Sequence, residues 1–352
     1  MGTLFDIPPK NDPKLLYARE KELHDLVSNL KERRWVVLLG PRRVGKTSLA
    51  KCAIKEFGHE SVTLDARENS DFTGSLLSSL PKSSSEFKIG ASATVPKVPF
   101  LSIGASYSKQ IVKQTLDAIL RSKSRLVLLL DEAQWFRNPR YLVMLLAHIY
   151  DYHYDKLTPI ITGSAVGVMK SILEPDRKSP LYGRPMISME VKKWAPSVSM
   201  SFLSEGLKQN KVSMDTDSRV ETVNALDGIP GWLTMFGYHF TANPRDYSKA
   251  LDRTVTEALK IVDDETANVA KLARGWPSHR KILQNLIHGS KRFTELVEAT
   301  DQTHSSLSKH LDMLQRLSYV EKDDEGKYAI VDPILRELMK KQAVRSRNRE
   351  ST

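Results

Sequence analysis

Cysteine is nearly absent from this chain of 352 residues, and long apolar runs are missing altogether. The one cysteine, Cys52, has no partner for a disulfide within the chain, so this is not a disulfide-stabilised protein of an oxidising compartment. No stretch reaches the roughly 18 apolar residues of a membrane-spanning helix, and the first residues lack the apolar core of a signal peptide. These absences predict a cytoplasmic protein without a membrane partner.

Acidic residues are fewer than basic ones, which gives the chain a net charge of +11. A basic balance is compatible with nucleic acids and with nucleotides, because both are polyanions. Most of the excess lies in residues 1–130, and only a small part follows residue 279. Basicity therefore does not assign polyanion binding to the C-terminal part of the chain.

A glycine-rich loop follows an apolar run at residues 35–47, which read WVVLLGPRRVGKT. The pattern is that of a P-loop, in which glycines let backbone N–H groups turn toward a phosphate. Lys46 is expected to reach the β- and γ-phosphates, and the Thr47 hydroxyl to ligate Mg²⁺. A helix predicted to follow adds its positive N-terminus to the anion site. The predicted nucleotide-binding residues of the loop are Gly40, Pro41, Arg42, Arg43, Val44, Gly45, Lys46, Thr47 and Ser48.

A second apolar run ends in two carboxylates at residues 126–134, which read LVLLLDEAQ. A strand without polar alternation is buried on both faces, as in a parallel sheet covered by helices. Its carboxyl end lies at the edge of the sheet where ligands bind. We expect Asp131 to hold Mg²⁺, mostly through water, and Glu132 to polarise the attacking water. With the P-loop, these residues predict ATP or ADP with Mg²⁺ as ligands, and hydrolysis of ATP.

Alternating strand and helix patterns predict an α/β fold over residues 1–192, a P-loop core with a three-layer parallel sheet. Strands are expected at 61–65, 126–131, 157–162 and 186–191, besides the one before the P-loop. Residues 83–108 interrupt this pattern with serine, glycine and proline, and predict either a β-hairpin insertion or a disordered loop. A helix is expected at 109–122.

The C-terminal half of the sequence predicts two further units. Residues 193–275 are mostly helical in pattern and form a lid domain. Residues 276–341 predict a winged helix, with helices at 279–288, 292–299 and 304–318 before a hairpin with an acidic-glycine turn. A basic tail occupies 342–352.

The P-loop, LVLLLDEAQ, ITGS at 161–164 and the glycine-proline lid motif GIPG at 228–231 occur in the order typical of an AAA+-type ATPase, and the chain also contains LYARE at 16–20 and SPLYGR at 179–184. Together with the terminal winged helix, these motifs resemble the archaeal ATPase family, which groups with the STAND signalling ATPases. The resemblance covers essentially the whole chain.

This resemblance implies roles for five residues outside the two central motifs. Ser164 would read the γ-phosphate at the end of the fourth strand. Tyr17 and Arg19 would lie near the adenine, and Pro230 in the lid would close over the base. Arg184 would complete the catalytic site, either of its own chain or of a neighbour in a homo-oligomer.

The winged helix leaves the function open between three alternatives. The first is an ATP-dependent molecular switch; the second is a replication-initiator-like ATPase that binds double-stranded DNA; the third is a signalling ATPase whose winged helix binds a protein. Lys309 and Arg316 are the only cations expected on the exposed face of the third helix, and the acidic wing tip at 323–325 would repel phosphate. Weak DNA binding or a protein partner is therefore favoured. The other residues expected on this face are His304, Ser305, Ser306, Ser308 and Asp312.

Overall fold

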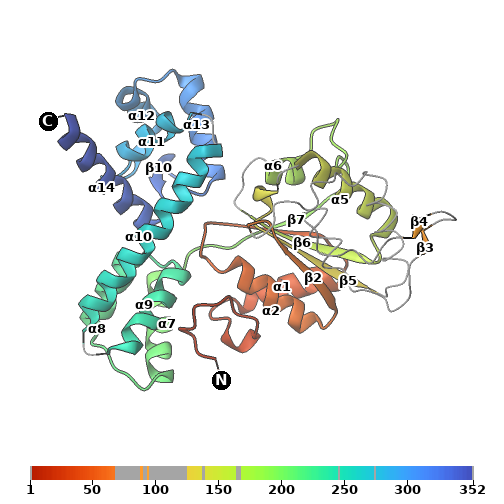
Figure 1. Ribbon diagram of the computed structural model, residues 1–352, viewed down its shortest axis with the longest axis horizontal. Helices are drawn as coiled ribbons and strands as arrows, with labels where there is room; N and C mark the ends of the chain where they lie inside the picture. Colours follow the sequence, from red (N-terminus) through yellow and green to blue (C-terminus); the bar gives the residue numbers. More distant parts are fainter. Residues whose placement is uncertain are drawn as a thin grey trace.

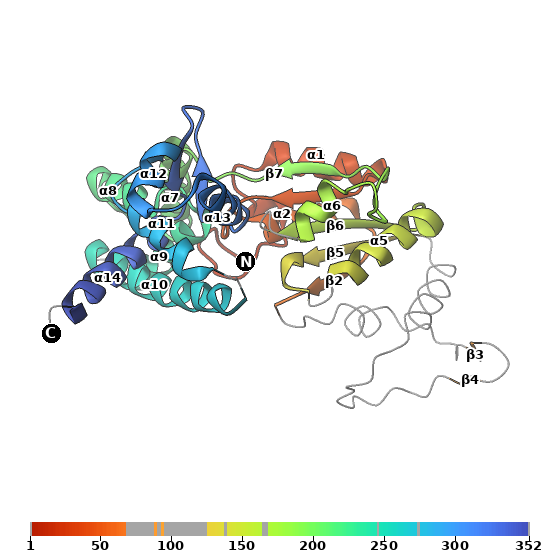
Figure 2. The same ribbon diagram turned by 90° about the horizontal axis from the view of Figure 1, so that it is seen from above.

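A computed structural model describes residues 2–67, 88–89, 93–94, 125–136, 139–163, 168–244, 246–272 and 275–350. Figures 1 and 2 show two parts side by side: a sheet with its covering helices, and a helical part that ends in the winged-helix elements. Among the described residues, no helix combines the length and the apolar character needed to cross a membrane.

The sheet has five parallel strands in the order β2-β5-β6-β1-β7. This arrangement confirms the predicted parallel P-loop fold. Because parallel strands share one carboxyl edge, the loops after β1 and β5 meet there. The strands are β1 (Val36–Leu39), β2 (Glu60–Asp65), β5 (Leu126–Asp131), β6 (Leu157–Gly163) and β7 (Ile187–Glu190).

Alternate residues of each central strand pack into two different apolar layers, which explains why the strand sequences are apolar throughout. Val127 and Leu129 face α1 (Glu20–Lys31) and α2 (Lys46–Phe57). Leu128 and Leu130 face α5 (Pro139–His153) and α6 (Val168–Leu173). The result is a three-layer sandwich of helices, sheet and helices.

The predicted insertion at 83–108 is described only in part. Strands β3 (Lys88–Ile89) and β4 (Ala93–Thr94) pair antiparallel within it. The remainder of the insertion and the helix predicted at 109–122 lie outside the described residues.

Four helices follow the sheet, in the stretch that was predicted as a lid. Helix α9 is apolar over most of its circumference and is largely buried, with Trp232 and Phe236 fully enclosed and Tyr238 exposed. We call these four the lid helices: α7 (Pro196–Gln209), α8 (Thr216–Leu226), α9 (Pro230–Ala242) and α10 (Tyr247–Leu272).

The winged-helix elements contain the predicted three helices and hairpin, and two elements that the sequence did not predict. The short strand β8 (Lys291–Arg292) joins the wing, which makes a three-stranded sheet in the order β8-β10-β9. A terminal helix, α14 (Pro333–Glu350), runs through most of the stretch predicted as a basic tail. The remaining elements are α11 (Trp276–Asn285), α12 (Phe293–Thr300), α13 (His304–Arg316), β9 (Val320–Lys322) and β10 (Lys327–Ile330).

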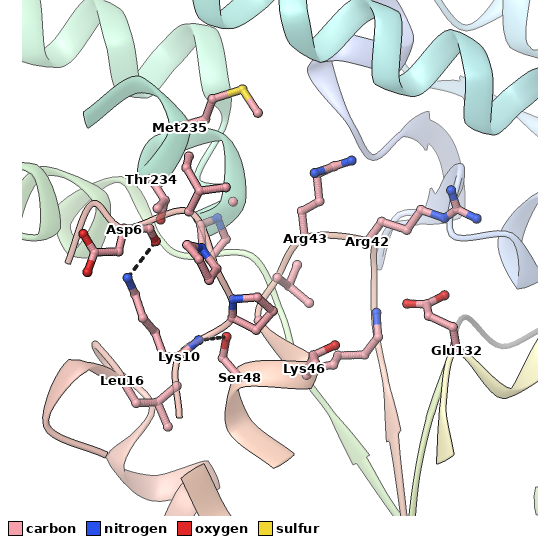
Figure 3. A pocket seen from close by; sticks show the side chains of 18 of the residues that line it. Asp6, Lys10, Leu16, Arg42, Arg43, Lys46, Ser48, Glu132, Thr234 and Met235 are labelled. Carbon is pink, nitrogen blue, oxygen red and sulfur yellow. Dashed lines mark hydrogen bonds between the residues drawn. The ribbon is translucent and has the colours of Figure 1, made fainter. Parts of the chain in front are cut away.

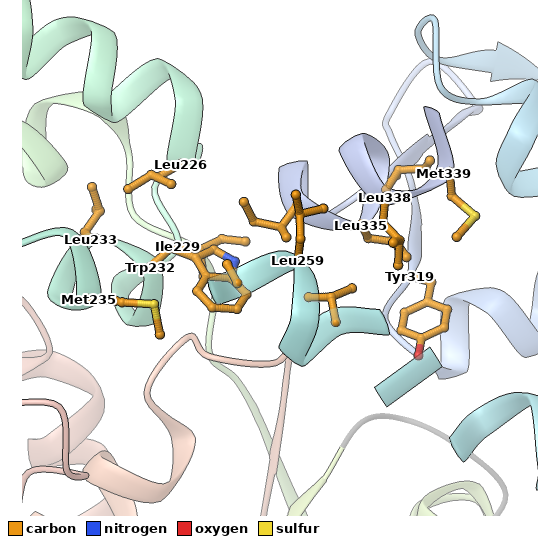
Figure 4. Close-up of a cluster of buried hydrophobic side chains, with 14 of the residues drawn as sticks. Leu226, Ile229, Trp232, Leu233, Met235, Leu259, Tyr319, Leu335, Leu338 and Met339 are labelled. Carbon is orange, nitrogen blue, oxygen red and sulfur yellow. The ribbon is translucent and has the colours of Figure 1, made fainter. Parts of the chain in front are cut away.

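The lid helices and the winged-helix elements share one apolar core. Figure 4 shows Trp232 and Leu259 of the lid together with Leu335 and Leu338 of α14 and with Tyr319, which directly precedes β9. Helix α10 packs against both α9 and α14. The two predicted units therefore pack as one body, whereas the sheet has apolar layers of its own.

Candidate nucleotide-binding site

A cavity of about 800 Å³ lies at the carboxyl edge of the sheet, between the P-loop and the lid helices. Figure 3 shows charged side chains, Lys46, Arg42 and Glu132, at one end of it. Leu16 and Met235 lie at the other end, where Figure 3 also shows Asp6 and Lys10. A nucleotide has phosphates at one end and a flat base at the other, so the cations beside the P-loop suit its phosphates and the apolar side chains suit its base.

Two glycines shape the P-loop for steric reasons. Gly40 has a φ of +144°, and a Cβ there would lie 2.2 Å from the Val191 carbonyl oxygen. Gly45 has a φ of +99° and immediately precedes α2. Both conformations are open to glycine and strained for other residues. The turn directs the start of α2, with its positive end, into the cavity.

Lys46 is 5% exposed at the start of α2. Its ammonium donates to the carbonyl oxygens of Gly40 (2.8 Å) and Pro41 (2.6 Å) within the same loop. Burial lowers the pKa of Lys46, and the neighbouring carboxylates of Glu132 and Asp131 oppose that shift. An anion in the loop would favour the charged lysine in the same way.

Thr47 and Asp131, the two predicted metal ligands, meet although 84 positions separate them in the sequence. The Thr47 hydroxyl lies 3.0 Å from both carboxylate oxygens of Asp131. Burial raises the pKa of Asp131, and hydrogen bonds from Thr162 and Thr47 oppose the rise. A hydroxyl and a carboxylate are oxygen donors of the kind that Mg²⁺ prefers, so the residues present fit this ion.

Thr162, at the end of β6, is a site residue that the sequence analysis missed. Its hydroxyl donates to Asp131 and accepts the backbone N–H of Glu132 at 3.1 Å. It thereby holds the carboxylate of Asp131 and the backbone of Glu132. The signal was available, because Thr162 directly precedes the Gly163-Ser164 pair from which Ser164 was chosen. Ser164 itself lies outside the described residues.

Glu132 is 9% exposed and lines the cavity. Its backbone has a φ of +52°, which is uncommon for a residue with a side chain. The position fits the role predicted for Glu132, a carboxylate held near the phosphate end.

Arg67 is another lining residue that was missed. Its guanidinium is held by Asp65 at the end of β2, with Nε 2.9 Å from Oδ1, and lies 3.5 Å from Asp131. Asp65 ends a strand that neighbours β5, so both carboxylates stand at the same edge of the sheet. The sequence signal was weak, because an exposed Asp-x-Arg after a strand is common in loops.

The two arginines of the P-loop both pair with Glu265 of lid helix α10. Arg42 reaches it at 2.6 Å and Arg43 at 3.2 Å. Burial acts to lower the pKa of Arg42, but Glu265 holds it above its ordinary value. Glu265 also lines the cavity, and it lies 222 positions from Arg43.

Arg43 connects further to the winged-helix elements. Its guanidinium stacks over the ring of Trp232, 4.2 Å from the centroid. The Trp232 indole N–H donates to Asp332, at 3.1 and 3.2 Å from the two oxygens. Asp332 directly precedes α14, and burial raises its pKa to about 6. A chain of contacts thus runs from the P-loop through the lid to the terminal helix.

The base-side predictions meet in the cavity as well. Tyr17 lines it and packs edge-on against Trp194 and Phe202, at 5.8 and 5.4 Å between ring centroids. Arg19 is 6% exposed and donates to the carbonyls of Val44 (3.3 Å) and Lys192. Arg19 therefore braces the P-loop from behind.

Pro230 lines the cavity at the first position of α9. The next residue, Gly231, donates its N–H to the Arg43 carbonyl at 2.9 Å. A Cβ on Gly231 would lie 2.8 Å from the Arg43 Cβ, so glycine permits this approach of lid and P-loop.

Arg184 is the one described site residue that the structure places elsewhere. It precedes β7, whose first residue pairs with the first residue of β1, so it lies at the amino edge of the sheet. Its Nη2 pairs with Asp151 at 2.7 Å. The P-loop lies at the opposite edge, and Arg184 does not reach the cavity of its own chain.

Comparisons with known proteins agree with this geometry. A family model described as an ATPase domain predominantly from Archaea matches residues 16–236, well over half of the chain. The chain belongs to this family of ATPases. A second model, described as a bacterial regulatory protein of the arsR family, matches residues 277–322, the helix-turn-helix region. No curated protein matches the chain.

Solved structures match along the whole length of this ATPase-family chain. The Walker-type ATPase PABY2304 of Pyrococcus abyssi is 26% identical, with a TM-score of 0.76 and coverage of 96% of this chain and 99% of that one. The ORC2 protein of Aeropyrum pernix is 16% identical, with a TM-score of 0.62 and coverage of 97% and 98%. The second likeness shows the fold alone.

Proposed function

We propose that this protein is a molecular switch that binds and hydrolyses ATP with Mg²⁺ and couples its nucleotide state to the winged helix. The P-loop cradle, the Thr47–Asp131 pair and the position of Glu132 support the chemistry. Thr47 and Asp131 would hold the ion, Asp131 mostly through water. When bound, Mg²⁺ supplies positive charge beside the β- and γ-phosphates.

Hydrolysis at this site requires a positioned water and a screened phosphate. Glu132 orients the water and takes its proton, while Lys46 offsets charge on the β- and γ-phosphates. The new bond forms between the water oxygen and the γ-phosphorus, and the bond to the β–γ bridging oxygen breaks. Ser164 remains our proposal for the residue that reads the γ-phosphate.

One observation carries the switch: Glu265 of the lid binds the two arginines that flank the phosphate site. The phosphate oxygens of a nucleoside triphosphate remain anionic when Mg²⁺ is bound. They compete with the Glu265 carboxylate for Arg42 and Arg43. ADP lacks the γ-phosphate and competes less. The two nucleotides therefore differ in how firmly they allow α10 to hold the P-loop, which is the differential interaction that a switch needs.

Movement of α10 would reach the winged helix directly. Both belong to one apolar core, and Trp232 and Asp332 add a polar contact across it. Interdigitated cores move as units rather than deform continuously. The lid and the winged helix are therefore expected to move together relative to the sheet.

A pair of spin labels tests the coupling. Cysteines introduced at Lys31 of α1 and Ser308 of α13, both exposed, report the distance between the two parts. We expect this distance to differ between a non-hydrolysable ATP analogue and ADP, and the difference to vanish in Glu265→Gln. A matched control is Glu257→Gln, on the same helix but paired with Arg253 and His239. A Glu265→Gln protein that keeps the full difference would refute the mechanism.

The helix-turn-helix match supports a second candidate, a DNA-binding ATPase of the replication-initiator kind. The exposed residues of α13 include one described cation, Lys309, together with the acidic Asp312. At the wing tip, Lys327 is paired with Glu325 at 2.6 Å. These charges favour weak duplex binding or a protein partner. The side chain of Arg316 lies outside the described residues.

A further inference from the structure

The N-terminal segment, residues 2–10, lies between the lid helices and α2 (Figure 1). Its Phe5 is only 2% exposed and packs between α7 and α9. A Cβ on Gly206 of α7 would lie 2.2 Å from the Phe5 ring, and a Cβ on Gly237 of α9 would also lie 2.2 Å from it. Neither glycine has a positive φ, so their role is the missing side chain. Together they form a slot for the Phe5 ring.

The same segment is held at its other end by the helix that begins at the P-loop. The Lys10 N–H donates to the Ser48 hydroxyl at 3.0 Å, and the Cys52 thiol lies 3.6 Å from the Lys10 carbonyl oxygen. The Lys10 ammonium folds back onto the carbonyls of Thr3 (2.9 Å) and Asp6 (2.7 Å). The segment is thus fixed to the lid at Phe5 and to the core at Lys10.

Between these two fixed points, Ile7, Pro8 and Pro9 line the cavity. Proline has a fixed φ and no N–H, so this stretch presents a stiff, largely apolar wall. Ile7 is 48% exposed, a high value for an isoleucine, and it faces a cavity that a ligand can fill. The wall lines the same cavity as Leu16 and Met235, which Figure 3 shows on the side away from Arg42 and Glu132.

We propose that Phe5 is a positioning residue for the nucleobase. By its anchorage in the glycine slot, it holds the wall of residues 7–9 against the base and makes base binding depend on the docked lid. The inference rests on the proposed function, since it presumes phosphates in the P-loop. Insertion of Phe5 into the glycine slot should strengthen binding of the base and leave binding of the phosphates unchanged.

Inorganic tripolyphosphate separates these two contributions, because it carries the phosphates without a base. With Mg²⁺ present, Phe5→Ala should weaken ATP binding about tenfold and leave tripolyphosphate binding unchanged. Phe240→Ala is the matched control: Phe240 is also 2% exposed in the lid core but does not belong to the N-terminal segment that lines the cavity. It should lower the melting temperature without changing the ratio of the two affinities.

A double-mutant cycle tests the slot itself. Gly237→Ala should expel the Phe5 ring and reproduce the selective loss of ATP affinity. In a Phe5→Ala background the slot is vacant, so the same Gly237→Ala change should have little further effect. Additive effects would overturn the slot, and equal loss of ATP and tripolyphosphate affinity would overturn the base-positioning role. Lys46→Ala must lose both ligands; if it retains both, the proposed function fails independently of Phe5.

Discussion

The sheet and the helical part of this ATPase-family protein are built on different plans. In the sheet, strand residues alternate between two apolar layers, and the polar groups stand at the strand ends. In the helical part, a single core runs from the lid into the winged helix. In the proposed function, the chemistry would depend on short local motifs, whereas the coupling would depend on a few side chains that are remote in sequence, such as Glu265 and Asp332.

The broadest effect, on nucleotide binding and turnover together, should come from the sheet side of this comparison. Lys46→Ala removes the main side-chain charge at the phosphate end, and we expect nucleotide binding and phosphate release to fall by about 100-fold or more. Lys51→Ala, on the same helix but outside the cavity, is the control and should keep both. Unchanged affinity and turnover in Lys46→Ala would show that the P-loop is not the nucleotide site.

Glu132→Gln should separate binding from chemistry. The amide keeps the shape of the carboxylate and removes the base, so ATP affinity should persist while single-turnover hydrolysis slows by about 10² to 10⁴. Equilibrium binding and quenched-flow measurements on the same preparation give both values. Equal losses of affinity and rate would instead assign Glu132 a structural or metal-binding role.

Substitution of Arg184 tests whether the catalytic site includes a residue from a second subunit. We propose that it acts on a neighbour's site, because its own chain holds it at the opposite edge of the sheet. Arg184→Ala should then lower turnover at least about tenfold, and mixing it with Lys46→Ala protein should restore activity. Turnover that is independent of protein concentration, with no rescue on mixing, would contradict this proposal.

A smaller effect is expected on stability, from the helical side. Asp332 titrates near pH 6 when folded, above its ordinary value of 3.8, so the folded state retains a proton that the unfolded state has lost. The free energy of unfolding should therefore fall as pH rises through this window. Urea unfolding of Asp332→Asn should show a flatter profile, while Asp324→Asn at the exposed wing tip should match the wild type. If the free energy of unfolding of Asp332→Asn falls with pH as steeply as that of the wild type, Asp332 is not the cause of the pH dependence.

The smallest effect should be on DNA. Binding of labelled duplexes is expected to be weak, steeply salt-dependent and reduced only several-fold by Lys309→Glu with Arg316→Glu. Fluorescence titrations at two salt concentrations measure it. Nanomolar, sequence-selective binding at physiological salt would favour the initiator-like function. If binding is salt-sensitive but unchanged by both substitutions, the DNA contacts the basic sheet half of the chain instead.

The sheet and the phosphate end were predictable because their signals are local. The run before Gly40 and the run before Asp131 each carry strand and ligand in one stretch, and parallel topology brings the strand ends together. Thr162 was not predicted as a site residue, because Ser164, two residues later in the same motif, was chosen instead. Strand β8 is two residues long and has no periodicity to detect.

The rest of the site depends on contacts between distant residues. Glu265 lies on α10 directly after two further acids, Asp263 and Asp264, and nothing local marks it as the partner of Arg42. Among the residues of α14 whose burial is described, up to Val344, the buried apolar ones lie in the first two turns, and mostly polar residues follow in the sequence, so this stretch was interpreted as a tail. Phe5 likewise cannot be recognised as a site residue from its neighbours in the sequence, because the two glycines that hold its ring lie about 200 and 230 positions away.

The single thiol of this chain makes it convenient for spectroscopy. Cys52 is fully enclosed, and burial raises its pKa to about 11, so at neutral pH it is a poor nucleophile toward maleimides. Probes can be attached to introduced cysteines without first removing it. Because its sulfur lies against the Lys10 carbonyl, Cys52 is also a built-in reporter, whose alkylation should accelerate whenever the N-terminal segment lifts from α2.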